Sequence, residues 1–578
     1  MRYSGKNQGV SAYFIAGTYV VLMGFDATDA ARNGLLGFAV QRTDKTESEQ
    51  YWLRGLRTFE ATFPNPPQGS LVSTQEHPVQ DFVWSDFTAK PDHSYVYKVV
   101  PVYGQPKNLE YGPAIEVEVA TESEKAAVHS VYFNRGVLAS QAYAREFHNV
   151  SPDKLTGAEQ EEAFKWLSRG LEEAMLGFIG QANAKGFGLR AAVYEFSYEP
   201  AIEAFGTAQQ KCGDVQIVYD ARVPSGATKA KPAQARIADV KKLLKKYKLD
   251  SPDVSTPRTE NGNFISHNKF IVLLERGKPK AVWTGSTNFT ESGIFGQSNV
   301  GHVVRDPEVA QAYLNYWTRL QHDPEENDIR DENESLDPEI QGYPPETGVT
   351  AIFSPRKTLD MLQWYAGAME NSKDVMCFTA AFGINKVFLA VLKGKQDHLN
   401  YLFLEKWANK KADAPAVQEQ IEKDHPCNQI AVGNYLDSDV LTEYLAKRCL
   451  IERRNPISAH VYYTHGKYML VDPLGEDPVV ITGSANFSDA STKNNDENMI
   501  IIRGDKRVAD IYLGEFMRLW QHYRFRYIVN ELAGQNGGDK YKPNYLDPTS
   551  AWVDPYFKDG SVKFLKRKAF SGPLAVTG

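Results

Sequence analysis

The sequence predicts an α/β protein made of two similarly built lobes, which follow an all-β sandwich domain. Three observations support this fold class. Short β-rich runs separated by turn residues fill residues 1–122, strand-like and helix-like runs alternate after that point, and one motif occurs twice, beginning at His267 and at His465. Alternating strands and helices are typical of layered α/β architectures. The repeated motif indicates that the α/β part contains two copies of one lobe.

The first 122 residues have the pattern of a β-sandwich. Clusters of Gly, Pro, Asp and Asn separate β-rich runs at residues 19–25, 35–42, 79–87, 95–103 and 114–120. The run W-S-D-F and the later run Y-V-Y-K-V-V-P-V-Y together resemble a fibronectin type III domain. We therefore predict a fibronectin III-like domain over residues 1–122, which orients or recruits for the lobes or simply supports the first of them.

The apolar stretch at residues 10–25 has two interpretations. It is similar to the apolar core of a signal peptide, but it contains polar and small residues and runs into the acidic sequence D-A-T-D-A-A. We therefore predict two β-strands broken at Gly17, and no run elsewhere is long enough to span a bilayer. The four cysteines are widely spaced and form no C-x-x-C pair, which fits a reducing compartment. The predicted location is cytoplasmic, with secretion as the alternative if residues 1–27 act as a signal peptide.

Composition and charge divide the rest of the chain. The whole sequence is 42% hydrophobic and 24% charged, with a net charge of -7, so it is typical of a soluble globular protein and not of a general polyanion binder. We predict a first lobe at residues 123–321 and a second at residues 347–535. The acidic, Pro-rich residues 322–346 between them indicate an exposed linker. A tail follows at residues 536–578, and its basic run K-F-L-K-R-K is interpreted as a solvated face.

The repeated motif has the same spacing in both copies. Each copy reads His-x-Lys, then an apolar run, then T-G-S-x-N-F. Gly285 lies 18 positions after His267, and Gly483 lies 18 positions after His465. Residues two apart on a strand share one face, so each His and Lys should point the same way, as should each Ser and Asn. A buried Lys is costly unless it is paired. Two such pairs therefore indicate a shared anion site, lined by His267, Lys269, Ser286, Asn288, His465, Lys467, Ser484 and Asn486.

These residue types suit one phosphoryl group. The lysines would neutralise its charge, and the Asn and Ser side chains would donate hydrogen bonds to its oxygens. One histidine would attack phosphorus and form a phosphohistidine, while the other would protonate the leaving oxygen and then activate water. This chemistry needs neither a metal nor an organic cofactor, and the carboxylate cluster of a magnesium site is absent from the motifs.

The paired motifs resemble the H-x-K-x4-D signatures of the phospholipase D superfamily over residues 123–535. The resemblance implies two α/β lobes about a pseudo-twofold axis, with the active site between them. The second copy is complete, with Asp472 in the motif and Glu497 after it, whereas the first has Leu274 and Asn299 at these places. An ideal strand would point Asp472 away from His465. We nevertheless count Asn299, Glu497 and Asp472 as the orienting residues.

The departures also suggest roles for the histidines. In family terms, Glu497 bonds the imidazole of its own lobe, and a carboxylate partner favours the imidazolium form that donates a proton. Asn299 would leave the other imidazole neutral. We therefore expect His267 to be the nucleophile and His465 the general acid, although the two rings face one phosphate and titrate together.

The superfamily fixes the reaction better than the substrate. Phospholipase D-type hydrolysis of phospholipid headgroups, with peripheral membrane contact, fits the acidic chain and its 12% aromatic content. The first alternative is an endonuclease acting on DNA or RNA, for which the basic runs at residues 229–231, 241–248 and 566–568 are candidate contacts. The second alternative is a non-enzymatic binding protein with a decayed hydrolase. Both intact His-Lys pairs oppose this last hypothesis.

Overall fold

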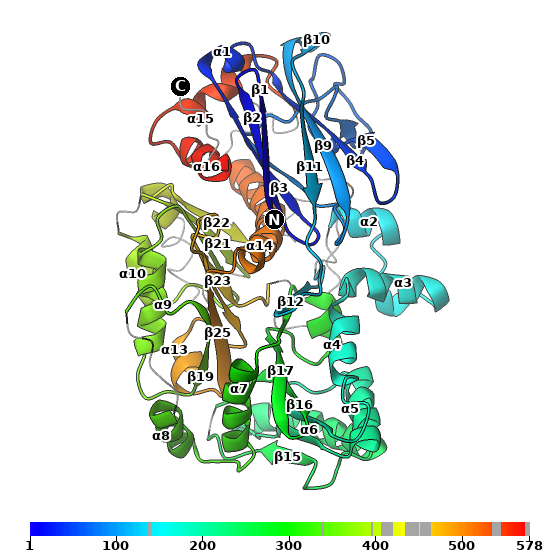
Figure 1. The fold of residues 1–578 in the computed structure, drawn as a ribbon, viewed down its shortest axis with the longest axis vertical. Coiled ribbons are helices and arrows are strands. Elements are labelled where there is room, and N and C mark those ends of the chain that lie inside the picture. Colours follow the sequence, from blue (N-terminus) through cyan, green and yellow to red (C-terminus); the bar gives the residue numbers. More distant parts are fainter. Residues whose placement is uncertain are drawn as a thin grey trace.

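The structure is a computed structural model of the 578-residue chain. It describes the chain apart from residues 137–139, 263, 337–339, 341, 395–396, 406–419, 434–449, 451–463, 535–544 and 573–578. An all-β domain lies at one end of the molecule, and two α/β lobes lie beside each other below it (Figure 1). Within the described residues, no helix combines the length and the apolarity needed to cross a membrane.

The N-terminal domain consists of two β-sheets that face each other. Aromatic side chains fill the space between them, with 4.5 Å between the ring centroids of Phe25 and Phe38 and 5.4 Å between those of Phe14 and Tyr97. The first sheet has the order β1 (Arg2–Asn7), β2 (Val10–Ala16), β3 (Val21–Ala27) and β8 (Val83–Asp86). The second has the order β10 (Asn108–Tyr111), β9 (Ser94–Gln105), β4 (Gly37–Asp44) and β5 (Glu49–Trp52), with β11 (Ile115–Ala120) also paired to β9. The two strands predicted on either side of Gly17 are confirmed as β2 and β3, while the fibronectin III-like identity of the domain stays a prediction.

The C-terminal helices α15 (Asp554–Phe557) and α16 (Val562–Phe570) pack on this domain. A Cβ on Gly24 would lie 1.9 Å from the Phe570 carbonyl oxygen, so only glycine allows α16 to come this close to β3. The prediction of a solvated basic face holds for Lys563 and Lys568, which are exposed, and is wrong for the two basic residues between them. The Arg567 side chain is buried and donates to the Asp26 carboxylate, and Lys566 forms an ion pair with Asp81 at 3.0 Å.

The first lobe is built on a seven-stranded mixed sheet. Buried runs rich in β-branched and aromatic residues form its central strands, as expected for strands covered on both faces. Helices α4 (Leu171–Ile179), α5 (Glu199–Cys212), α6 (Ala227–Lys246) and α7 (Pro307–Leu320) belong to this lobe. The strand order is β12 (His129–Phe133), β18 (Val300–Val304), β17 (Lys278–Gly285), β16 (Lys269–Glu275), β13 (Phe187–Val193), β14 (Val215–Asp220) and β15 (Ser255–Arg258).

The second lobe repeats this topology position by position. Three neighbouring strands pair in parallel at one side of each sheet, and the remaining pairs are antiparallel. The order is β19 (Gly348–Ser354), β25 (Glu497–Arg503), β24 (Val479–Gly483), β23 (Tyr468–Val471), β20 (Val375–Ala380), β21 (Leu399–Leu404) and β22 (Asn428–Val432). The predicted fold class, two phospholipase D-like lobes after an all-β domain, is therefore confirmed.

Backbone contacts join the lobes where the motifs begin. The His267 N–H donates to the Asp496 carbonyl oxygen at 2.9 Å, and the His465 N–H donates to the Ser298 carbonyl oxygen at 3.3 Å. In both contacts, the first residue of one motif bonds to the opposite lobe. His267 bonds to the segment just before β25, and His465 bonds to the segment just before β18. The two contacts are equivalent under the pseudo-twofold relation, and they place both motifs at the lobe interface.

The acidic segment predicted as an exposed linker contains the helix α8 (Glu326–Leu336). Ile329 and Asn333, one helical turn apart, are buried, and the Asn333 amide donates to the Pro355 carbonyl oxygen at 3.0 Å. Arg330 donates to the Lys493 carbonyl oxygen at 2.7 Å. The exposed-linker prediction is wrong for these residues, because an acidic helix with one inward face can still pack against the second lobe.

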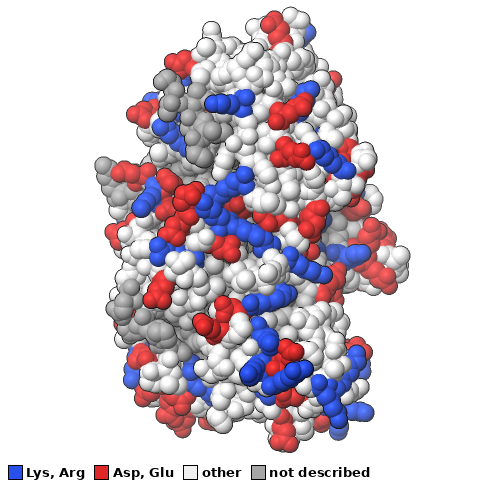
Figure 2. Space-filling model, in the orientation of Figure 1, with Lys and Arg blue, Asp and Glu red and all other residues white. Residues whose placement is uncertain are grey.

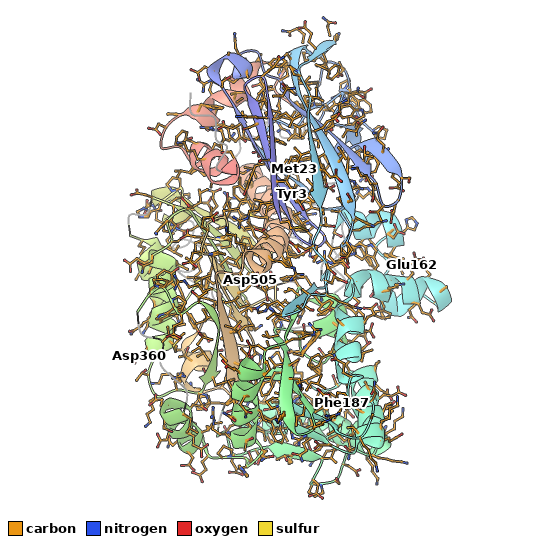
Figure 3. All side chains as sticks on the ribbon, viewed as in Figure 1. Tyr3, Met23, Glu162, Phe187, Asp360 and Asp505 are labelled. Atoms are coloured by element: carbon orange, nitrogen blue, oxygen red, sulfur yellow. The ribbon has the colours of Figure 1, made fainter. Side chains whose placement is uncertain are left out.

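Ion pairs connect the β-domain to the long helix α14 (Lys506–Gly534). Arg2 lies 2.9 Å from Asp510, and Arg507 lies 2.9 Å from Glu122. Asp505, labelled in Figure 3, precedes α14 and accepts a hydrogen bond from the Val508 N–H at 2.9 Å. On the face drawn in Figure 2, a band of basic side chains runs down the middle of the molecule, with acidic side chains on both sides of it.

Candidate active site

The structure brings the four predicted catalytic side chains together between the lobes. His267 and Lys269 lie where β16 begins, and His465 and Lys467 lie just before β23. All four are nearly enclosed: the histidines are 6% and 5% exposed and both lysines are 1% exposed. Two ammonium groups held this far from water form a strong site for an anion.

Each imidazole is held by the opposite lobe. Nδ1 of His267 lies 2.8 Å from Oε2 of Glu497, and Nδ1 of His465 lies 2.9 Å from Oδ1 of Asn299. The expectation that Glu497 would bond the histidine of its own lobe is therefore wrong. The crossing follows from the backbone contacts above, which carry the start of each motif across the interface. It leaves Nε2 of each ring as the nitrogen for chemistry.

Two serines fix the residues that hold the histidines. Ser286 Oγ donates to Asn299 Oδ1 at 2.8 Å, and Ser484 Oγ donates to Glu497 Oε2 at 2.7 Å. The amide nitrogen of Asn299 donates to the Gly293 carbonyl oxygen at 2.7 Å, so Oδ1 must accept from the ring. A hydroxyl has one proton to donate. The predicted donation from Ser286 and Ser484 to phosphate is therefore wrong. These hydroxyls instead hold the side chains of Asn299 and Glu497 in place.

The lysine ammonium groups are anchored but keep donors for a ligand. Lys269 Nζ donates to the His267 carbonyl oxygen at 2.5 Å, and Lys467 Nζ donates to the His465 carbonyl oxygen at 2.7 Å. Each ammonium has two further protons. Burial lowers the pKa of Lys269 to about 8. Burial and then the charge of Lys269 lower the pKa of Lys467 well below its ordinary value, so each lysine needs a nearby anion.

Burial also shifts the acid and the two rings. It raises the pKa of Glu497 to about 7, against the opposing effect of Lys269. Burial, followed by the two lysine charges, lowers the pKa of both His267 and His465 well below the ordinary value. Burial and the lysine charges therefore favour neutral imidazoles, and a phosphate anion bound between the rings would favour protonation of one of them.

The two motif asparagines differ in their contacts. The Asn288 amide nitrogen donates to Glu195 Oε2 at 2.7 Å. The amide oxygens of Asn288 and Asn486 are buried, and neither has a hydrogen-bond partner within the described part of the chain. The site is thus less symmetric at these positions than the repeated T-G-S-x-N-F sequence predicts.

Asp472 lies outside the site, so the prediction that it orients the catalytic groups is wrong. One of its carboxylate oxygens accepts hydrogen bonds at 2.9 Å from the Ser372 hydroxyl and from the Lys373 and Asp374 N–H groups, which fixes the turn before β20. Its counterpart Leu274 is buried in an apolar cluster that contains residues of both lobes. The missing first-motif Asp therefore removes no group from the site.

Sequence reasoning missed several residues that support the site. The Tyr194 ring lies 4.8 Å from the His267 ring, centroid to centroid. Asp220 accepts from the Ser266 N–H at 3.1 Å, and Glu405 accepts from the Thr464 N–H at 2.8 Å in the other lobe. The sequence contained a signal for these two acids. In each lobe, the acid lies at the end of the second of the three parallel strands or directly after it. Within the described residues, no group of three or more His, Cys, Asp or Glu side chains is arranged to hold a metal ion.

Parts of both lobes are similar to known proteins. A family model described as the PLD-like domain of cardiolipin synthase matches residues 178–321 and 415–520. The mitochondrial cardiolipin hydrolase of Xenopus tropicalis is 43% identical over 61 residues, which are 11% of this chain and 27% of the relative. The human protein of the same name is 38% identical over 61 residues, or 11% and 22%. The chain thus spans about a quarter of the length of the curated relatives it matches.

Solved structures were also compared. The phosphatidylserine synthase of Haemophilus influenzae Rd KW20 is 10% identical, with 64% of this chain and 91% of that chain covered and a TM-score of 0.43. The yeast tyrosyl-DNA phosphodiesterase is 12% identical, with 58% and 88% covered and a TM-score of 0.31. The family model therefore matches part of each lobe, in agreement with the two sheets of the same strand order.

Proposed function

We propose that the chain hydrolyses phosphodiesters through a phosphohistidine intermediate, and that its substrates are phospholipids cleaved at the headgroup. The arrangement that carries this proposal is the pair of imidazoles, each bonded through Nδ1 to the opposite lobe and each beside a buried lysine. One ring can attack phosphorus while the other serves the leaving oxygen. The lysines neutralise the charge on the non-bridging oxygens.

His267 is the proposed nucleophile, for a reason that differs from the one the sequence suggested. Its Nδ1–H faces the carboxylate of Glu497, which keeps Nε2 unprotonated and stabilises the positive ring that forms when Nε2 bonds to phosphorus. His465 faces the neutral Asn299 oxygen, so its imidazolium gives up the Nε2 proton more readily.

The proposed reaction consists of two successive displacements at phosphorus. The Nε2 lone pair of His267 bonds to phosphorus, the bond from phosphorus to the leaving oxygen breaks, and that oxygen takes the Nε2 proton of His465. Neutral His465 then removes a proton from water, and the oxygen of that water bonds to phosphorus. The bond from phosphorus to His267 breaks, which releases a phosphate monoester and restores both rings.

Two observations support phospholipid as the substrate class. The curated relatives that match the chain are named as cardiolipin hydrolases, and the family model is named for cardiolipin synthase. The chain is also acidic overall, which disfavours tight binding to a polyanion.

The test is mass spectrometry of mixed phospholipid vesicles incubated with the protein in dilute ethanol and EDTA. We expect phosphatidic acid and phosphatidylethanol, because ethanol can replace water in the second step. Both products should vanish with His267→Ala and persist with His322→Ala, which replaces an exposed histidine outside the site. Cleavage of plasmid or RNA without any lipid turnover would favour the nuclease alternative, and turnover of neither would overturn the proposal.

A further inference from the structure

One acidic residue at the site breaks the symmetry of the two lobes. Ala191 lies opposite Ile271 in the first lobe, and Phe378 lies opposite Met469 in the second. Following these registers to the end of each strand pairs Glu195 with Phe382 as counterparts. Glu195 is therefore an addition to the duplicated phosphate site and not part of it.

The contacts of Glu195 leave its charge directed at the site. Its Oε2 accepts from the Asn288 amide at 2.7 Å, and the residue is partly exposed. Within the described residues, no basic side chain forms an ion pair with it. Its carboxylate is nevertheless near enough to raise the pKa of both Lys269 and Lys467, against the larger effect of burial. Glu195 thus lies beside the anion site, close enough for its charge to act on both lysines but without an ion-pair contact to a described basic side chain.

A carboxylate in this place selects against most phosphodiesters. A bound phosphodiester brings a second negative charge close to Glu195, and like charges in a partly desolvated site repel. A substrate with a cationic group near its phosphate offsets this repulsion, because that group can form an ion pair with Glu195. A nucleic acid strand would instead bring further phosphates, so the same carboxylate disfavours it.

We propose that Glu195 is a specificity-determining residue that recognises an ammonium group on an alcohol esterified to the phosphate. This inference rests on the proposed phosphodiesterase function and narrows it to zwitterionic phosphodiesters. The counterpart position in the second lobe holds Phe382, which is 46% exposed, so only the first lobe has a carboxylate there.

The test compares two soluble probes that share a leaving group. One is p-nitrophenyl phosphorylcholine, and the other is the p-nitrophenyl ester with a 3,3-dimethylbutyl group, the uncharged isostere of choline. The native chain should prefer the choline ester by about tenfold in kcat/KM, equivalent to about 1.4 kcal/mol. Glu195→Gln should abolish the preference by weakening turnover of the choline ester alone, while Glu195→Asp should keep part of it.

Three other outcomes would overturn the inference. If Glu195 only positions Asn288, Glu195→Gln and Asn288→Ala will slow both probes equally and leave their ratio unchanged, which overturns the inference. A native ratio near one also overturns it while leaving the proposed function intact. Turnover of neither probe by the native chain, with vesicle lipids also unchanged, overturns both.

Discussion

Nδ1 of His267 lies 2.8 Å from Oε2 of Glu497, although the two residues belong to different lobes and are 230 positions apart. The reciprocal contact joins His465 to Asn299. Neither lobe therefore contains a complete catalytic unit, since each supplies the imidazole that the other orients. The two lobes share one topology, and the exchange of partners between them makes each lobe depend on the other.

Replacing Glu497 by Gln should lower kcat by about 10²–10⁴-fold, the usual contribution of an oriented acid or base. Gln cannot stabilise the positive phosphohistidine ring, although it preserves the shape of the carboxylate. Phosphoenzyme trapping during single turnover is the measurement, with the thermal midpoint as the folding control. A fall in kcat below threefold would contradict the pairing of Glu497 with the nucleophile.

The serines should behave as positioning residues. Ser286→Ala and Ser484→Ala each remove a donor to an orienting side chain, so we expect lower kcat with KM nearly unchanged. Steady-state kinetics on a soluble p-nitrophenyl diester would measure both constants. A rise in KM at constant kcat would instead show that the hydroxyls bind substrate phosphate, as the sequence alone suggested.

The sequence predicted what depends on local geometry. Residues two apart share a strand face, so the spacing alone groups His267 with Lys269 and His465 with Lys467. The equal spacing of the two motifs then indicated two equivalent lobes. The exchange of partners could not be predicted in this way, because it depends on which strand end of one lobe meets the other lobe.

Two predictions made from composition failed in part, because tertiary packing decides which charged segments are buried. Residues 322–346 are acidic enough to suggest solvent exposure, yet Ile329 and Asn333 share one buried face of α8. The error at the basic run near the C-terminus has a similar cause. Arg567 is buried and bonds to Asp26, which lies on a strand far away in the sequence. Charged side chains are mostly exposed unless they are paired, and the sequence alone does not identify a partner that is distant along the chain.

Asp472 should matter for stability and not for chemistry. Asp472→Ala removes the acceptor for three hydrogen bonds in the turn before β20, and we expect a loss of about 1–3 kcal/mol in the free energy of unfolding. Urea unfolding measures this loss, and kcat at a temperature where the variant is folded should stay near the native value. Leu274→Asp is the matched change in the first lobe, and burying an unpaired carboxylate there should destabilise the chain without raising kcat.

The buried lysine gives the unfolding free energy a distinct dependence on pH. The pKa of Lys269 is about 8 in the folded chain and about 10.5 in the unfolded chain, so between these values the unfolded state binds more protons. Stability from this group therefore rises with pH over that window, and below pH 8 the buried charge costs about 3 kcal/mol. Lys269→Met should then be the more stable protein at pH 7, with an advantage that shrinks as pH rises from 8 to 10.5. Chemical unfolding of both proteins across that range is the measurement. Bound inorganic phosphate should reduce the difference at pH 7 by stabilising the charged native site, and a pH-independent difference without phosphate would show that Lys269 stays charged in the fold.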